Sequence, residues 1–182
     1  MVERVGVEAI VLNGGSSSGK SSLARCLQDL LGASWLTLGV DDLVRALPGG
    51  DQNSGDQQSI DLRADGSITV GEDFRRAEDA WYKGLAAIAR CGAGLIIDEV
   101  FLGGRASQDR LAEALSELTV LWVGVRCDPD VAAAREGERP DRTVGMARLQ
   151  AEQVHNGVVH DLVVDTTRAS SEECARIVIA RL

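Results

Sequence analysis

The segment from Gly14 to Ser21 has the residue types and spacing needed to bind a phosphate chain. It reads Gly14-x-x-x-x-Gly19-Lys20-Ser21, between an apolar run and a helix-forming run. Glycines let backbone N–H groups turn toward phosphate oxygens, and a helix N-terminus adds partial positive charge. Lysine at this place reaches the β- and γ-phosphates, and the following serine hydroxyl binds Mg²⁺. The predicted cofactors are therefore ATP and Mg²⁺.

The predicted nucleotide-binding residues are contiguous: Gly14, Gly15, Ser16, Ser17, Ser18, Gly19, Lys20, Ser21 and Ser22. This pattern leaves the reaction open, because GTPases, motor ATPases and small-molecule kinases all use it. The structural alternative is a turn rich in glycine and serine that only caps a helix. A lysine directly before a serine at a helix start serves no obvious capping purpose, so phosphate binding is favoured.

Carboxylates follow two other apolar runs, and they bear on the choice of reaction. Asp98 and Glu99 follow the run 95–97, and Asp41 follows the run 38–40. If these runs are parallel strands, their carboxyl ends meet at the edge where α/β sheets bind ligands. Asp98 is predicted to hold Mg²⁺ together with Ser21, directly or through water. The alternative is that these acids only cap the following loop.

Asp41 is the candidate general base. A kinase acting on an alcohol gains from a carboxylate that accepts the hydroxyl proton while the oxygen attacks phosphorus. An aspartate before Leu43-Val44-Arg45 is also a good helix N-cap. The spacing alone does not separate these two interpretations.

Three arginines follow the fourth apolar run, in a stretch that Gly137 and Pro140 interrupt: Arg135, Arg139 and Arg142. Arginines on such a segment suit a lid that closes over a nucleotide and stabilises charge on the transferred group. Ordinary solvated arginines, paired with the neighbouring acids, are the alternative. On the residues alone that alternative is slightly favoured.

Short aliphatic runs alternate with stretches of helical spacing, which predicts an α/β fold with a five-stranded parallel sheet flanked by helices. The predicted strands are Ala9–Asn13, Trp35–Val40, Gly94–Asp98, Val120–Arg126 and Leu162–Asp165. The predicted helices are Lys20–Leu31, Asp42–Leu47, Asp73–Cys91, Ser107–Leu115, Pro129–Gly137, Gly145–Asn156 and Ser171–Leu182. The polar region 48–68 is predicted to be a flexible loop, of the kind that forms a lid or binds a ligand.

Length and composition predict a single domain over residues 1–182 and restrict the partners. The formal net charge of -9 repels a nucleic-acid backbone, so no nucleic-acid partner is expected. The four scattered cysteines lack a Cys-x-x-Cys pair, and no apolar run reaches transmembrane length. We therefore expect a cytoplasmic protein without a membrane partner.

Several segments resemble the chloramphenicol phosphotransferase family, from residue 11 to near the end of the chain. The similar segments are Leu12-Asn13-Gly14-Gly15-Ser16-Ser17, Gly19-Lys20-Ser21, Gly39-Val40-Asp41, Asp98-Glu99-Val100-Phe101-Leu102-Gly103-Gly104, Leu121-Trp122-Val123-Gly124-Val125-Arg126-Cys127-Asp128 and Val164-Asp165-Thr166-Thr167. The phosphate loop is shared with many kinases, whereas the 100–104 and 122–128 segments are far more particular.

The resemblance implies a P-loop kinase fold and ATP-dependent phosphorylation of the primary (3-) hydroxyl of chloramphenicol, which would inactivate this antibiotic. It places the family's base on Asp41 and its lid arginines on Arg135, Arg139 and Arg142. The chain has Asp98-Glu99 where the family is expected to show two aspartates, and region 48–68, on the acceptor side, departs most. A kinase for another antibiotic or metabolite alcohol, and a nucleotide-binding regulatory protein without an acceptor, stay open as alternatives.

Overall fold

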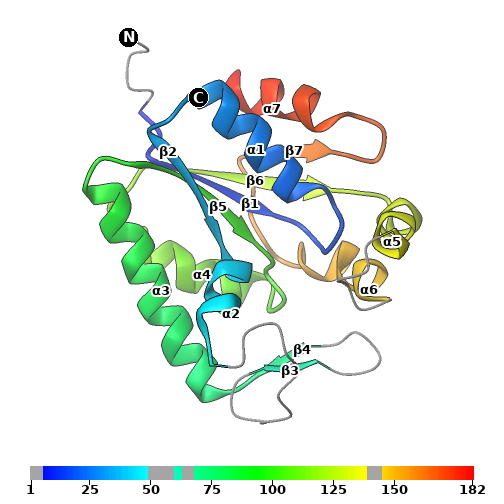
Figure 1. Ribbon diagram of the computed structural model, residues 1–182, viewed down its shortest axis with the longest axis horizontal. Helices are drawn as coiled ribbons and strands as arrows, with labels where there is room; N and C mark the ends of the chain where they lie inside the picture. Colours follow the sequence, from blue (N-terminus) through cyan, green and yellow to red (C-terminus); the bar gives the residue numbers. More distant parts are fainter. Residues whose placement is uncertain (1–5, 49–59, 63–67, 139–144) are drawn as a thin grey trace.

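A five-stranded parallel sheet forms the centre of the molecule (Figure 1). The computed structural model describes residues 6–48, 60–62, 68–138 and 145–182. The strands of the sheet are β1 Ala9–Asn13, β2 Trp35–Gly39, β5 Gly94–Glu99, β6 Val120–Arg126 and β7 Leu162–Asp165. Their order is β2-β5-β1-β6-β7, and every neighbouring pair is parallel. All five carboxyl ends therefore lie at one edge.

Helices cover both faces of the sheet, as Figure 1 shows. One face carries α1 Lys20–Leu31 and α7 Ser171–Ile179, and the other carries α3 Glu72–Arg90 and α4 Arg105–Ala114. Three further helices follow strands β2 and β6: α2 Val40–Ala46, α5 Pro129–Gly137 and α6 Met146–Gln153. The sheet with its helices confirms the predicted fold class.

Strand β1 shows why the chain folds this way, because all its side chains are buried and they alternate between two cores. Ile10 and Leu12 pack with α1 and α7, whereas Ala9 and Val11 pack with α3 and α4. A strand buried on both faces needs this continuous apolar run, which is typical of the centre of a parallel sheet. β1 thereby fixes the start of the phosphate loop in the middle of the sheet.

The polar region 48–68 was predicted to be a loop, and most of it lies outside the described residues. Its described part corrects the prediction, because β3 Ile60–Leu62 pairs with β4 Ile68–Val70 as an antiparallel hairpin. The strands are three residues long, too short for the alternation that predicts a strand.

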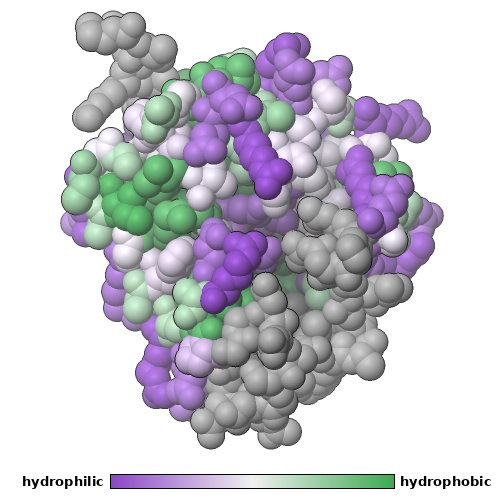
Figure 2. Space-filling model, viewed as in Figure 1, coloured by the Kyte–Doolittle hydropathy of each residue, from purple (hydrophilic) through white to green (hydrophobic). Residues whose placement is uncertain are grey.

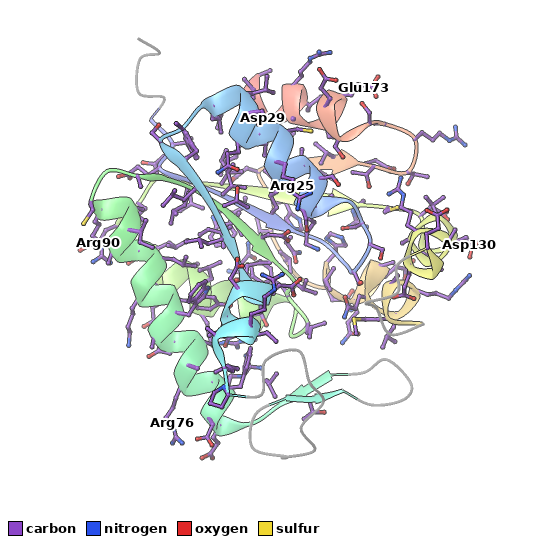
Figure 3. The ribbon with its side chains drawn as sticks, in the orientation of Figure 1. Arg25, Asp29, Arg76, Arg90, Asp130 and Glu173 are labelled. Atoms are coloured by element: carbon purple, nitrogen blue, oxygen red, sulfur yellow. The ribbon has the colours of Figure 1, made fainter. Side chains whose placement is uncertain are left out.

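The surface is mainly polar over the face seen in Figure 2, with an apolar area between β2 and α3. Charged side chains lie on the outer faces of the helices, such as Arg25 and Asp29 on α1 and Arg90 on α3 (Figure 3). Leu36, on the edge strand β2, is 41% exposed. Among the described helices, none is long and apolar enough to cross a membrane.

Candidate active site

The phosphate loop connects the end of β1 to the start of α1 (Figure 1). Gly19 has a φ of 87°, in the left-handed region that favours glycine. A Cβ atom on Gly14 would lie 2.5 Å from the carbonyl oxygen of Val125, so only glycine fits against β6 there. These glycines are therefore required by backbone geometry, as the sequence pattern predicts.

Lys20, Ser21 and Asp98 lie together at the end of β5. The Ser21 hydroxyl donates to the Asp98 carboxylate with an Oγ–Oδ2 distance of 2.8 Å. Lys20 Nζ lies 3.7 Å from Asp98 Oδ1 and donates to the Gly15 carbonyl at 3.0 Å. Lys20 is only 7% exposed, so its positive charge stays close to the loop. The structure thus brings together the predicted phosphate ligand and both predicted metal ligands.

Three buried hydroxyl groups of the loop have no hydrogen-bond partner within the described part of the chain: those of Ser16, Ser17 and Ser18. Buried polar groups in proteins are normally hydrogen-bonded, so such a cluster needs an explanation. A ligand rich in acceptor oxygens, such as a polyphosphate, would supply the missing partners. The Ser21 hydroxyl and Asp98 carboxylate are oxygen donors of the kind Mg²⁺ prefers. Among the described residues, no three His, Cys, Asp or Glu are grouped to hold a metal ion by themselves.

Asp98 and Glu99 point to opposite faces of the sheet, as successive strand residues do. Asp98 faces Lys20 and Ser21, whereas Glu99 is 2% exposed and near Glu78 and Tyr82. Burial, with the negative charges of Asp98 and Glu78, raises the pKa of Glu99 to about 8. Burial of the Tyr82 hydroxyl likewise raises the pKa of Tyr82. The Glu99 carboxyl group therefore lies on the opposite side of β5 from the Ser21–Asp98 pair.

Asp41 lies in the first turn of α2, beside the end of β5. Helix α2 begins at Val40 with Gly39 as its N-cap, and the Asp42 carboxylate accepts a hydrogen bond from Gly39 N at 2.8 Å. The capping acid is therefore Asp42, and Asp41 does not occupy the N-cap position that was its alternative. A Cβ atom on Gly39 would lie 2.4 Å from the Asp98 carbonyl oxygen, so the chain packs closely against the end of β5 two residues before Asp41. Its side chain is exposed.

Of the three predicted lid arginines, the structure describes Arg135, whereas Arg139 and Arg142 lie outside the described residues. Arg135, on α5, donates to the Thr166 carbonyl at 2.8 Å and to Cys127 Sγ at 3.3 Å. The guanidinium thus binds the loop that follows β7. Both of these contacts are with protein groups that follow β6 and β7.

A cavity of about 590 Å³ opens beside the phosphate loop, between the ends of β6 and β7 and helix α6. It is lined by Arg126, Cys127, Asp128, Pro129, Ala151, Glu152, Asp165, Thr167, Arg168 and Ala169. The lining residue Ala151 lies next to the phosphate loop, because a Cβ atom on Gly15 would be 3.2 Å from Ala151 N. Its volume is large enough for a nucleoside, and half of the lining residues are charged: Arg126, Asp128, Glu152, Asp165 and Arg168.

Sequence reasoning missed several residues around this cavity. Arg126 ends β6, and the strand-end rule that selected Asp98 would have found it. Gln150 and Thr166 contact the phosphate loop, but a glutamine in a helix and a threonine after a strand carry no signal of their own. The rings of His155 and His160 lie 5.5 Å apart, edge to face.

Three comparisons with known proteins bear on this site. A model of the family described as chloramphenicol phosphotransferase-like protein matches residues 7–182. Two Mycobacterium tuberculosis proteins, from strains CDC 1551 and H37Rv, are 32% identical over 188 aligned residues. Both are provisionally named O-phosphotransferases, and the alignment covers 92% of this chain and 78% of each relative.

Solved structures resemble the fold at lower identity. A sugar kinase from Janibacter sp., in an unliganded state, has a TM-score of 0.70 at 18% identity, covering 96% of this chain and 93% of that one. A gluconokinase from Sinorhizobium meliloti has a TM-score of 0.64 at 19% identity, covering 98% and 92%. These neighbours place the chain in the P-loop kinase fold.

Proposed function

Because the chain is a phosphotransferase of the chloramphenicol phosphotransferase-like family, we propose that it moves the γ-phosphoryl group of ATP to an alcohol, the primary hydroxyl of chloramphenicol. The observation that carries the proposal is the cluster of Lys20, Ser21 and Asp98 beside buried serine hydroxyls that have no hydrogen-bond partner among the described residues. The resemblance of the segments 39–41, 98–104 and 121–128 supports this acceptor. We infer a cytoplasmic location, where ATP is available.

In this proposal the phosphate chain lies along the loop from Gly14 to Ser22. Lys20 holds the β- and γ-phosphates, and the backbone N–H groups at the start of α1 add the partial positive charge of a helix N-terminus. Ser21 and Asp98 hold Mg²⁺, which when bound neutralises charge on the phosphate oxygens. The nucleoside occupies the 590 Å³ cavity between β6, β7 and α6.

Asp41 serves as the general base from the end of β2. The acceptor oxygen forms a bond to the γ-phosphorus while the bond from phosphorus to the β–γ bridging oxygen breaks, releasing ADP. The acceptor proton passes to the Asp41 carboxylate. Arg135, Arg139 and Arg142 are proposed to stabilise the transferred group, and Arg135 would have to leave its present contacts with Thr166 and Cys127.

The direct test is to incubate the protein with ATP, Mg²⁺ and chloramphenicol and to measure the mass of the product. We expect a product heavier by one phosphoryl group, and none with the 3-deoxy analogue of the acceptor. Absence of product at high enzyme concentration would contradict chloramphenicol as the acceptor. A panel of other antibiotics and metabolite alcohols, scored by ADP release, then distinguishes another acceptor from an acceptor-free regulatory protein.

The role of Asp41 is tested by Asp41→Asn, with the neighbouring capping acid as control. We expect Asp41→Asn to lower kcat by about a hundredfold or more and to leave ATP affinity nearly unchanged, because the carboxylate acts on the acceptor. Asp42→Asn removes one charge from the same turn and should keep transfer within a few-fold of the wild type. Undiminished transfer by Asp41→Asn would eliminate Asp41 as the base.

A further inference from the structure

Helix α6 rests directly on the first half of the phosphate loop. A Cβ atom on Gly15 would lie 3.1 Å from the backbone of Gln150, so the loop and the helix approach as closely as glycine permits. The Gln150 side chain is 2% exposed, and its Oε1 accepts a hydrogen bond from Ser16 N at 2.9 Å. A buried side chain of α6 therefore binds the backbone of the loop.

A second buried side chain, from the segment that follows β7, also binds the loop. Thr166 follows β7, is 3% exposed, and donates from Oγ1 to the Ser18 carbonyl at 2.6 Å. Gln150 and Thr166 thus hold the residues immediately before and after Ser17. Ser17 has a φ of 56° and is the one non-glycine residue with positive φ in the described part of the chain. Such a conformation is unfavourable for serine and persists only where its surroundings enforce it.

The backbone segments that carry these two side chains are themselves held by neighbours. Asn13, at the end of β1, donates from Nδ2 to the Val154 carbonyl at 2.8 Å, which anchors the end of α6. The start of α6 is held by the buried Glu136 carboxylate, which accepts from Gly145 N and Ala147 N, both at 2.7 Å. Arg135 donates to the Thr166 carbonyl at 2.8 Å. Before a nucleotide binds, a shift of Gln150 or Thr166 away from the loop would therefore strain or break further hydrogen bonds.

We propose that Gln150 and Thr166 are positioning residues that hold the phosphate loop around Ser17 in its phosphate-binding shape before the nucleotide arrives. This inference rests on the proposed function of the loop as the ATP site. Holding Ser17 in the left-handed conformation turns the backbone at the middle of the loop. A loop that already has that shape loses less conformational entropy when the phosphates bind, so the affinity is higher.

The test compares Gln150→Met with wild type in ATP affinity, measured by calorimetry, and in adenosine affinity, measured by calorimetric competition with ATP. Methionine keeps the length of the side chain and removes the acceptor oxygen. We expect ATP affinity to fall about tenfold, which corresponds to the loss of one hydrogen bond, while adenosine affinity stays within about twofold. Because adenosine lacks phosphates, a change confined to the phosphate loop leaves its affinity intact. A general loss of structure would instead weaken both ligands equally.

The control is Gln153→Met, the same change on an exposed side chain of α6, which should leave ATP affinity unchanged. Thr166→Val should weaken ATP as Gln150→Met does, and Thr166→Ser, which keeps the hydroxyl, should restore it. Combining Gln150→Met with Thr166→Val should cost less than the sum of the single losses, because both residues hold the same turn.

Equal weakening of ATP and adenosine by Gln150→Met, or the same loss in Gln153→Met, would overturn the inference. An additive loss in the double variant would overturn the claim that both residues act on Ser17. Failure of the proposed function gives a different result from failure of this inference. If the proposed function fails, the wild-type protein binds ATP and transfers no phosphoryl group to any alcohol. In that case the affinity ratios still decide the positioning role.

Discussion

At the scale of single residues, burial separates two acids that are neighbours in the sequence. Asp98 faces the phosphate loop, and Glu99 lies 2% exposed on the other face of the sheet. Burial raises the pKa of Glu99 to about 8, so its carboxyl group is largely protonated at neutral pH. Its Oε1 also has no hydrogen-bond partner within the described residues. Glu99 therefore costs stability whenever it has to ionise.

Glu99→Gln is expected to stabilise the protein above about pH 6. The native state binds more protons than the unfolded state between the ordinary pKa near 4.5 and the raised value of about 8, so wild-type stability falls as pH rises through that window. Glutamine does not titrate and removes this loss, about 4 kcal/mol at pH 8. Urea unfolding at pH 5 and pH 8 without Mg²⁺ measures it. A variant as pH-dependent as the wild type would contradict the prediction.

His155 gives the opposite pH dependence. It is 8% exposed, and burial, followed by the positive charge of Arg126, lowers its pKa to about 4. The unfolded state binds more protons between pH 6.5 and pH 4, so stability falls as pH drops through that window. The loss attributable to His155 is up to about 3 kcal/mol. His155→Phe, which keeps a ring against His160, should lose less stability than wild type between pH 7 and pH 4.5 in urea unfolding. Equal losses would mean that other groups cause the acid sensitivity.

At the scale of elements, the sequence predicts best where periodicity and burial agree. Strands β1, β6 and β7 and helices α1 and α5 begin and end at the predicted residues. In β1 the apolar run is buried throughout, and α5 begins at Pro129 directly after the capping Asp128. Helix α2 was predicted to start at residue 42, but it starts at Val40 because Asp42 caps Gly39 from within the helix. The β3–β4 hairpin was missed because its strands are short.

The candidate site divides in the same way. Lys20, Ser21 and Asp98 could be predicted because one motif and one strand end determine their positions. Gln150 and Thr166 could not, because their role depends on contacts with Ser16 and Ser18, over 100 residues away in sequence. Arg135 was predicted to face the nucleotide, yet its present contacts are with Thr166 and Cys127, which sequence spacing does not reveal.

The link between α5 and α6 gives a prediction at this scale. Glu136 of α5 is 2% exposed and accepts hydrogen bonds from two backbone N–H groups at the start of α6, Gly145 and Ala147. Glu136→Gln removes the charge and one acceptor, and should lower the free energy of unfolding by about 1–3 kcal/mol. Urea unfolding measures it. Glu138→Gln, at an exposed position near the end of α5, is the control and should change stability by less than about 0.5 kcal/mol.

At the scale of the whole molecule, the candidate site draws on most of the sheet. The phosphate loop follows β1, Asp98 ends β5, Asp41 follows β2, and the cavity lies between the ends of β6 and β7. The net charge is -9, so the positive groups that favour an anionic nucleotide have to be local, and buried Lys20 provides one. A bound nucleotide would thus bridge segments that are far apart along the chain.

We therefore expect ATP with Mg²⁺ to raise the temperature of unfolding of the whole chain in one step, as for a single domain spanning residues 1–182. At a ligand concentration of about 100 times Kd the stabilisation is about 2.7 kcal/mol, which for a chain of this length corresponds to about 5–10 °C. Scanning calorimetry measures the shift. Lys20→Met should abolish most of it, because the lysine supplies the buried charge next to the phosphates, whereas Lys83→Met, on the exposed face of α3, should keep it. Two separate transitions, of which ATP shifts only one, would contradict a single cooperative domain, and a shift that survives Lys20→Met would place the nucleotide elsewhere.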